Sequence, residues 1–490
     1  MIATLWWRYP GRVSGSGGET WPFPVRAMWL RELLQASQSS YCRRTLARRP
    51  FLGKPSHKTS HTFIRLADRK AMTMTAVETI PACRRQTPNP ARCGLPTLVV
   101  GAQLGKNPYS PGAGLHPAAL VGRGGELHDW NVALRRIENS RPAQSVVLHG
   151  LHGMGKTVLL GEFHRRAEDR HWMTVIIEAN AGSPLRDILA RGLYPVVREL
   201  VRPRAGEKLK TALATFKTFS VKVDIAGAWS FGCDLVPEPG RGNSGGLESD
   251  LSELIGDLAQ AAHEQGRGLA ILIDEAQDLT RDELKALCGI CYQAGQLGWP
   301  FLLALAGLPS LPRLLSKANS CTEELFSYRD TNLLESDAAR QALVRAAAAE
   351  GVSWDEDAVS YVLTEAQGHP YLLQEYGQAT WNAAEGATLT YDDARVGVVS
   401  GQAHLDAGFY RSQWERATRA QQAYLRAMAV DRAGPTQSAD VASRLGKTAM
   451  SVGAFRDSLI KKGLIYAPHQ GQVAYALPGM AAFIFRQSRP

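Results

Sequence analysis

One glycine-rich stretch constrains the fold of this chain more than any other feature of its sequence. Residues 150–157 read GLHGMGKT and fit the pattern G-x-x-x-x-G-K-[ST] at every fixed position. The stretch follows an apolar run, SVVLH, and precedes an expected helix, KTVLLGEFHRRAED. A glycine-rich turn between a strand and a helix directs backbone N–H groups at phosphate oxygens. The stretch therefore predicts a nucleoside triphosphate site, with ATP and Mg²⁺ as its ligands, in an α/β domain.

Each part of this loop has an expected role in binding the triphosphate. The glycines allow the backbone to curl, so that successive N–H groups point at the phosphates. Lys156 is expected to reach the β- and γ-phosphates, and the Thr157 hydroxyl is expected to bind Mg²⁺. We expect nucleotide contacts from the whole loop and the residue that follows it: Gly150, Leu151, His152, Gly153, Met154, Gly155, Lys156, Thr157 and Val158.

A second apolar run ends in two acidic residues. Residues 269–279 read LAILIDEAQDL, which predicts a buried strand with Asp274 and Glu275 at its carboxyl end. Open α/β sheets bind their ligands at that edge. We expect Asp274 to hold Mg²⁺ through water, and Glu275 to be the catalytic group that orients and polarises the attacking water. The alternative is that DEAQD is only the acidic start of a helix.

Apolar runs alternate with helical segments through the middle of the chain. The runs SVVLH, TVIIEA, LAILI and PFLLALAG are continuously apolar, which is typical of strands buried on both faces. A further strand is expected at FSVKVDIAG, residues 219–227. This alternation predicts a three-layer α/β domain with a parallel sheet over residues 108–328. Residues 329–410 are helical throughout and predict a lid behind the sheet.

The two ends of the chain are basic and differ from its middle. Residues 1–107 are expected to be a mostly disordered leader and linker. The leader is either a basic nucleic-acid arm or a stretch upstream of a true start at Met72 or Met74. Residues 411–490 form a further unit with 12 Lys and Arg against 4 Asp and Glu, in a chain of net charge +10. This charge favours an anionic partner, although a solvated basic surface explains it equally well.

The sequence contains no sign of a membrane protein or of a metal centre built on cysteine. No run of about 18 apolar residues is present, and Arg8 interrupts the start of the chain. The scattered cysteines require no oxidising compartment, so we expect a cytoplasmic protein. Cys288 and Cys291 lie three residues apart on an expected helix, so they are expected to be buried core thiols. A metal or redox role is the alternative.

The last 80 residues have the order helix, helix, turn, helix, hairpin. This order predicts an α+β winged helix-turn-helix domain, with ATRAQQAYLRAMAV as its first helix and KTAMSVGAFRDSLIKKG as its recognition helix. Double-stranded DNA is the expected partner, and packing or protein contact is the alternative. The candidate DNA contacts lie at the entry turn, along the recognition helix and at the wing tip: Arg444, Lys447, Thr448, Ser451, Arg456, Lys461, Lys462, His469, Gln470 and Gln472.

Four segments together resemble the AAA+ ATPases. They are LVGRGGEL at 120–127, GLHGMGKT, ILIDEAQDL and GHPYLLQEYG at 368–377. The resemblance is to the group related to origin-recognition initiators and STAND switch ATPases, and residues 108–490 also look like actinobacterial ATP-binding proteins. It implies that the first segment lies against the adenine and that the start of the fourth faces the nucleotide. The residues implicated in this way are Leu120, Val121, Gly122, Arg123, His369 and Pro370.

The chain departs from this family at its sensor positions. The strand after the acidic pair ends in Ala306 and Gly307, and Ser310 is the nearest hydroxyl, where a polar sensor is usual. His369 and Pro370 stand where a sensor arginine is usual, as in the switch-type members. Arg329 is either an arginine finger or a surface arginine. These departures predict slow hydrolysis.

The function expected from the sequence is that of an ATPase that couples ATP binding or hydrolysis to DNA association. One alternative is a regulatory switch whose winged helix contacts a protein. Another is an ATPase associated with transposition or defence. A homo-oligomer is compatible with all three.

Overall fold

The computed structural model describes residues 104–200, 207–220, 241–432 and 434–487. Most of the expected leader lies outside these residues, and its last part forms a short 3-10 helix, η1 (Leu104–Lys106). The strand expected at 219–227 also lies almost wholly outside them. Its first residue, Phe219, is instead the last residue of a helix, α5 (Glu207–Phe219).

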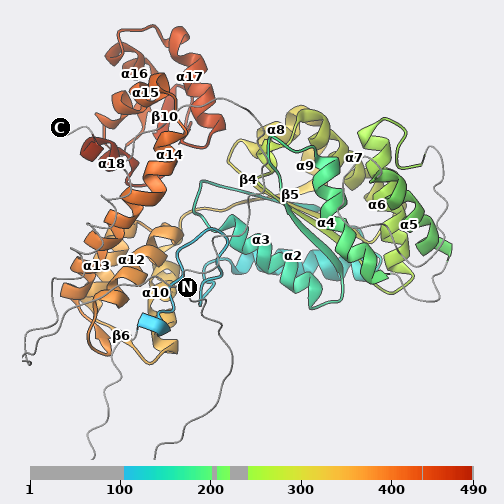
Figure 1. Ribbon diagram of the computed structural model, residues 1–490, viewed down its shortest axis with the longest axis horizontal. Helices are drawn as coiled ribbons and strands as arrows, with labels where there is room; N and C mark the ends of the chain where they lie inside the picture. The colour runs from blue at the N-terminus through green and yellow to red at the C-terminus, as the bar shows by residue number, and fades with distance from the viewer. Residues whose placement is uncertain (1–103, 201–206, 221–240, 433, 488–490) are drawn as a thin grey trace, which may run out of the picture. The chain divides into compact units, whose positions relative to one another are not determined.

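A five-stranded parallel sheet forms the first part of the described chain (Figure 1). Its order is β2-β3-β4-β1-β5, and Val147 pairs with Leu305 and Tyr328 on either side of it. Because every strand runs in the same direction, all five carboxyl ends meet at one edge. The strands are β1 (Ser145–His149), β2 (Met173–Glu178), β3 (Leu269–Asp274), β4 (Phe301–Gly307) and β5 (Phe326–Asp330).

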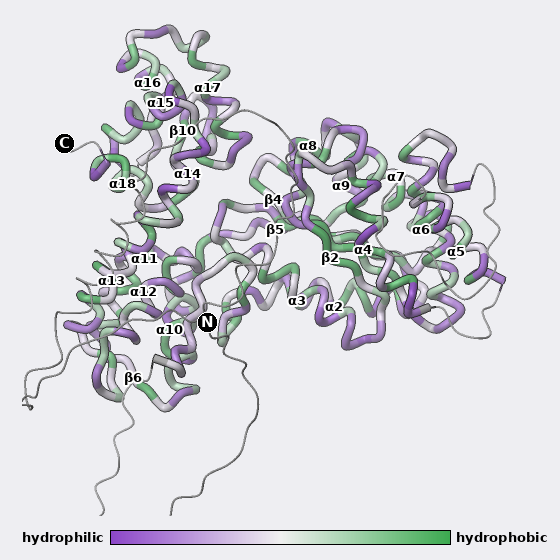
Figure 2. Tube along the Cα trace, viewed as in Figure 1, coloured by the Kyte–Doolittle hydropathy of each residue, from purple (hydrophilic) through white to green (hydrophobic). Residues whose placement is uncertain are grey.

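Helices cover both faces of this sheet, which is the three-layer arrangement that the sequence predicts. Along β3, Leu269, Ile271 and Ile273 enter one core, and the alternate residues Ala270 and Leu272 enter the other. Figure 2 shows the resulting hydrophobic character of the strands. One face carries α2 (Gly124–Glu138) and α3 (Lys156–Glu168). The other carries α4 (Leu185–Leu200), α6 (Leu247–His263), α7 (Arg281–Leu297) and α8 (Leu311–Ala318), and α5 packs outside them against α4 and α6.

An edge strand, β5, crosses the boundary that we expected between the sheet domain and the lid at 328/329. It follows a one-turn helix, α9 (Thr322–Leu325), and pairs along its whole length with β1. The residues FSYRD have no continuous apolar run, and Phe326 is the only one of the five that is fully buried. The sheet therefore ends at Asp330, two residues later than expected.

Residues 336–405 form the helical part that the sequence predicts as a lid. It consists of α10 (Ser336–Ala349), α11 (Glu356–Ala366), α12 (Pro370–Ala383) and α13 (Tyr391–Leu405), with a pair of two-residue strands, β6 (Ser353–Trp354) and β7 (Thr388–Leu389). A π-helical turn, η3 (Asp406–Tyr410), continues α13 directly into α14 (Arg411–Glu415). The boundary expected at 410/411 therefore falls inside a continuous helical stretch.

The C-terminal part contains the three helices and the hairpin that its pattern predicts, with two further elements. The predicted ones are α15 (Arg419–Ala429), α16 (Ser438–Arg444), α17 (Ala449–Lys461), β9 (Ile465–Tyr466) and β10 (Gln472–Tyr475). The additions are β8 (Thr436–Gln437), which pairs with β10, and α18 (Met480–Gln487). One hydrophobic core runs through this part and the lid. Across the described residues, no helix combines the length and apolar character needed to cross a membrane.

Candidate ATP site

The phosphate loop joins the carboxyl end of β1 to the first residue of α3. Gly153 and Gly155 have φ angles of +75° and +85°, a left-handed region that favours glycine. Space is limiting as well, because a Cβ on Gly150 would lie 2.4 Å from the Thr331 carbonyl oxygen. A Cβ on Gly153 would lie 2.5 Å from Cε1 of His369. Glycine is therefore required at these positions by the turn, by its neighbours or by both.

The Lys156 side chain is buried and folds over its own loop. Its Nζ donates hydrogen bonds to the carbonyl oxygens of Gly150, at 3.0 Å, and Leu151, at 2.8 Å. Burial lowers the pKa of Lys156, whereas the nearby Glu275 and Asp274 carboxylates raise it. When a triphosphate approaches this loop, Lys156 Nζ would exchange these carbonyl oxygens for phosphate oxygens, which are stronger acceptors.

A short hydrogen bond connects the start of α3 to the end of β3. Thr157 Oγ1 donates to Asp274 Oδ2 at 2.6 Å, although 117 residues separate the two. Burial raises the pKa of Asp274, while this bond and a second one, from the Glu275 backbone N–H to Asp274 Oδ1 at 2.8 Å, lower it. A hydroxyl and a carboxylate oxygen are hard donors of the kind that Mg²⁺ selects. The two residues expected to hold the metal therefore lie together.

Glu275 lies immediately beyond β3 and lines the same cavity as the loop. Its φ angle is +50°, which turns the chain sharply into a 3-10 helix, η2 (Ala276–Asp278). The side chain accepts a hydrogen bond of 2.5 Å from Nε2 of Gln277. Only one turn of 3-10 helix follows, so the acidic pair does not begin an α-helix. The alternative interpretation, in which DEAQD is only the acidic start of a helix, is therefore wrong.

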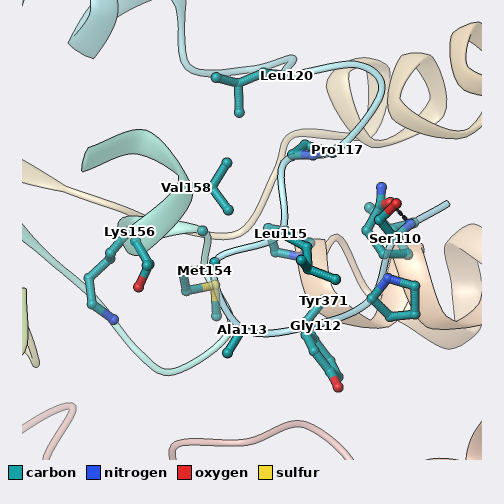
Figure 3. A pocket seen from close by; sticks show the side chains of 18 of the residues that line it. Ser110, Gly112, Ala113, Leu115, Pro117, Leu120, Met154, Lys156, Val158 and Tyr371 are labelled. Carbon is teal, nitrogen blue, oxygen red and sulfur yellow. Dashed lines mark hydrogen bonds between the residues drawn. The ribbon is translucent and has the colours of Figure 1, made fainter. Parts of the chain in front are cut away.

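A cavity of about 300 Å³ opens beside the phosphate loop. Figure 3 shows Lys156, Met154 and Val158 on one side of it and Tyr371, from the start of α12, on another. A segment that crosses from the lid to α2, residues 110–121, completes the lining. Of the residues implicated by resemblance, the cavity is lined by Leu120, Val121, Arg123 and Pro370. The sequence did not indicate the earlier part of this segment, because its Pro and Gly content is typical of a linker.

Comparison with known proteins agrees with this geometry. Residues 119–304 match the family model described as the AAA ATPase domain. This chain is an ATPase. Residues 407–484 match a second model, described as a domain of unknown function (DUF8462). No curated protein matches the chain in sequence.

Solved structures resemble the ATPase over most of its length. The Walker-type ATPase PAby2304 of Pyrococcus abyssi has a TM-score of 0.50 at 17% identity, covering 75% of this chain and 96% of that one. The ORC2 protein of Aeropyrum pernix has a TM-score of 0.47 at 14% identity, with 76% and 95% covered. Cdc6p from Pyrobaculum aerophilum has a TM-score of 0.39 at 15% identity, with 78% and 98% covered. The similarity to PAby2304 shows a shared P-loop ATPase fold.

Arg123 of the ATPase is buried and bonded to backbone atoms. Its guanidinium donates to the carbonyl oxygens of Met154, at 3.1 Å, and Asn332, at 2.6 Å. It therefore ties the phosphate loop to the segment that leaves the sheet after β5. Gly122, with a φ angle of +73°, is exposed and outside the cavity lining, next to Leu334 and Ala338. Gly150, Leu151, Gly122 and His369 are the expected nucleotide residues that do not line the cavity.

His369 lies behind the phosphate loop and is fully buried. Its Nε2 donates to the His152 carbonyl oxygen at 3.1 Å. Burial lowers the pKa of His369 to about 4, so the ring is neutral at pH 7. His369 therefore supports the loop from the lid side through a backbone contact, and Pro370 starts α12 and lines the cavity.

A polar side chain from η2, Gln277, lies at the end of β4, and the sequence analysis did not identify it. Ala306 and Gly307 offer no polar side chain, and Ser310 makes no side-chain cap at α8. However, Gln277 Oε1 accepts a hydrogen bond of 2.9 Å from the Leu308 backbone N–H, directly after β4. The signal was present in the motif DEAQD, but its contact with the next strand depends on the tertiary structure.

Arg329 and the two helical cysteines lie away from the cavity. Arg329, on β5, forms an ion pair with Asp129 at 2.5 Å, and both side chains are about 40% exposed. Cys288 and Cys291 are buried in α7, and burial raises the pKa of each thiol to about 12. Cys291 Sγ lies 3.5 Å from Ser145 Oγ, so this pair packs in the core as expected.

The candidate DNA contacts differ in exposure and in the partners they already have within the chain. Arg444 is paired with Asp431 at 2.6 Å, and Lys462 Nζ donates to the Arg416 carbonyl oxygen at 2.7 Å and to Gln421 Oε1 at 2.8 Å. Arg456 is only partly exposed beside Asp457, and Gln472 is partly exposed in β10. The exposed members are Arg444, Lys447, Thr448, Ser451, Lys461, His469 and Gln470. Of these, Ser451 Oγ donates to the Thr448 carbonyl oxygen at 2.8 Å, and the Thr448 side chain caps α17.

Proposed function

We propose that this ATPase couples ATP binding and hydrolysis to association with double-stranded DNA through a C-terminal winged helix. The observation that carries the nucleotide part is the hydrogen bond of 2.6 Å between Thr157 and Asp274. It joins the phosphate loop to the acidic end of β3, and so brings together the groups that a magnesium–triphosphate complex needs. The proposed location is the cytoplasm.

In this proposal the site residues divide the work of phosphoryl transfer. Thr157 and Asp274 hold Mg²⁺, which neutralises charge on the phosphates when it is bound. Lys156 leaves its loop carbonyls for the β- and γ-phosphates. Glu275 accepts the proton of a water molecule whose oxygen bonds to the γ-phosphorus, while the bond to the bridging oxygen breaks and ADP leaves. Leu120, Val121 and Pro370 contact the base.

The proposed DNA-binding surface is the exposed side of α17 and the turn between β9 and β10. Lys447 and Lys461 flank the exposed residues Thr448 and Ser451, whose hydroxyls also take part in the N-cap of α17. His469 and Gln470 lie in the hairpin turn. The excess of basic residues after 410 supports an anionic partner. Lysines at the ends of the helix suit phosphate contacts, whereas short hydroxyl side chains suit positioning on the duplex.

One contact favours a second candidate function, a switch whose C-terminal part restrains the nucleotide site. A Cβ on Gly463, directly after α17, would lie 2.4 Å from Nε2 of His152 and 2.9 Å from Leu308. The phosphate loop and the end of α17 are therefore in contact. In the switch, this contact holds the loop until a protein partner, rather than DNA, displaces the C-terminal part. An ATPase associated with transposition or defence remains the third candidate, and self-association is compatible with each.

The first experiment measures ATP turnover by the full chain with and without duplex DNA. We expect DNA to raise turnover, and we expect Lys156→Ala and Glu275→Gln to abolish it. Binding of DNA should weaken steeply with salt, and replacement of Lys447 and Lys461 by Ala should reduce the salt dependence, since each lost phosphate contact lowers the slope by about 1. Lys285→Ala, on the exposed side of α7, is the matched control.

Two results would separate the candidates. Tight nucleotide binding without any DNA binding or stimulation would exclude the DNA-coupled function and favour the switch. In that case, His152→Ala should release nucleotide faster and raise amide exchange at residues 462–464. Turnover that persists in Glu275→Gln would instead contradict the assignment of the catalytic group.

A further inference from the structure

We propose that Gln277 is the residue that positions Glu275 for hydrolysis and links it to the end of β4. This inference rests on the proposed catalytic role of Glu275. It assigns to one side chain two tasks: holding the carboxylate, and connecting it to the strand whose end lacks a polar side chain.

The amide of Gln277 bridges two partners on opposite sides. Its Oε1 accepts from the Leu308 backbone N–H at 2.9 Å, and its Nε2 donates to Glu275 Oε2 at 2.5 Å. Because a backbone N–H can only donate, the first bond fixes which end of the amide is oxygen. The NH₂ group must then face the carboxylate. Glu275 therefore keeps one oxygen bound and has the other available to a water molecule.

The end of β4 is shaped to receive this amide. A Cβ on Gly307 would lie 2.6 Å from Gln277 Oε1 and 2.9 Å from Leu311, so only glycine leaves room for the bridge. The two residues that the sequence shows as lacking a sensor group, Ala306 and Gly307, thus border a polar group supplied by the preceding turn. Gln277 compensates from η2 for the side chain that β4 does not carry.

The bridge also explains how Glu275 is held in its turn. Glu275 has a left-handed backbone conformation, which is strained for a residue with a side chain. Its carboxylate lies within electrostatic range of Lys156 from α3, and of Asp274 and Asp278 on either side in sequence; Arg416, after α14, in turn acts on Asp278. Asp274 and Asp278 repel the Glu275 carboxylate, whereas Lys156 attracts it. A donor anchored to β4 fixes its position among them.

Gln277→Glu is the sharpest test, because it separates the two bonds. A glutamate keeps the acceptor for the Leu308 N–H and loses the donor to Glu275. We expect kcat to fall about ten- to hundredfold while the Kd for ATP stays within about twofold, since the loss is confined to positioning.

Two further variants test the bridge without introducing a charged side chain. Gln277→Leu removes both bonds, and Gly307→Ala displaces the amide from the β4 side without altering it; both should lower kcat more than they change KM. Gln144→Glu is the matched control, because Gln144 likewise bonds to a backbone group, donating from Nε2 to the Glu324 carbonyl oxygen at 2.9 Å, but at the opposite end of the sheet.

The outcomes distinguish this inference from the proposed function. If Glu275→Gln abolishes turnover and Gln277→Glu retains the wild-type kcat, Gln277 only supports Leu308 and the inference is overturned alone. If Gln277→Glu loses ATP binding, it belongs to the binding site and the inference is also overturned. If Glu275→Gln retains turnover, the catalytic assignment and the inference that rests on it both fail.

Discussion

At the residue scale, a glycine of the phosphate loop and a glycine of the helix that follows it differ sharply in what they tolerate. Gly153 has a φ angle of +75° and lies against His369, whereas Gly161 lies inside α3, where an added Cβ would meet nothing within 4 Å. The turn therefore requires glycine at position 153, whereas nothing around position 161 does. The steric contact with His369 is the part of this difference that only the structure shows.

Gly153→Ala should therefore destabilise the protein by about 1–3 kcal/mol and weaken ATP binding, because it adds left-handed strain and a steric clash. Gly161→Ala should stabilise it by about 0.5–1 kcal/mol, because alanine has the higher helix propensity. Chemical denaturation and ATP titration of both variants measure these effects. Equal effects of the two substitutions would contradict the assigned geometry of the loop.

His369 makes stability depend on pH. Burial lowers its pKa from 6.5 to about 4, so the unfolded state binds more protons between these two values. Stability is therefore complete above pH 6.5 and falls as the pH is lowered, by about 2 kcal/mol between pH 6.5 and pH 5.

Thermal unfolding as a function of pH tests whether His369 causes this pH dependence. His369→Gln should reduce the pH dependence, although some should remain because the pKa of His152 is also lowered, to about 4. His469→Gln, at an exposed position, should leave the wild-type slope. If both variants keep that slope, another group is responsible for it.

At the scale of elements, one segment connects the lid to the cavity. Tyr109 is buried against α12, where a Cβ on Gly377 would lie 2.7 Å from its ring. Its hydroxyl donates to the Leu343 carbonyl oxygen at 2.6 Å and accepts from Trp354 Nε1 at 2.8 Å. The segment that lines the cavity, residues 110–121, begins at the next residue. Its position therefore depends on the lid.

Tyr109→Phe should lower stability by about 1–3 kcal/mol, because it leaves the Leu343 carbonyl without its buried donor. It should also speed the dissociation of ATP, because the segment loses its anchor. Stopped-flow release of a fluorescent ATP analogue measures the second effect. Tyr391→Phe, at an exposed position on α13, is the control, and unchanged release from Tyr109→Phe would disprove the link.

At the scale of the whole molecule, the lid and the C-terminal part share one hydrophobic core, whereas the sheet has its own two. Leu459 of α17 and Leu373 of α12 are both fully buried in the shared core. A core of this kind makes the two parts lose stability together.

Leu459→Ala should cost about 2–5 kcal/mol and speed amide exchange in α12 as well as in α17. Exchange in β3 should change less. Met450→Ala, at a residue that is 91% exposed, is the control and should have no effect. Faster exchange confined to residues 411–487 would show that the C-terminal part is stable independently of the lid.

By itself, the sequence determined the features that depend on local pattern. The phosphate loop, the two acidic residues, four of the five parallel strands and the helices of the lid follow from glycine spacing and from runs of apolar residues. These features are strongly patterned because the predicted strands are mostly buried and the loop glycines have backbone requirements of their own. The edge strand β5, which is half buried, had no such pattern.

Only the tertiary structure decided which distant groups meet. The hydrogen bond from Thr157 to Asp274, the bridge from Gln277 to Leu308 and the contact of His369 with the loop all join residues on different elements. It also showed that Arg123, Arg444 and Lys462 are already bonded within the chain. The physical reason is that a side chain's partners are set by how strands and helices pack, and sequence spacing carries no record of neighbours more than a few turns away.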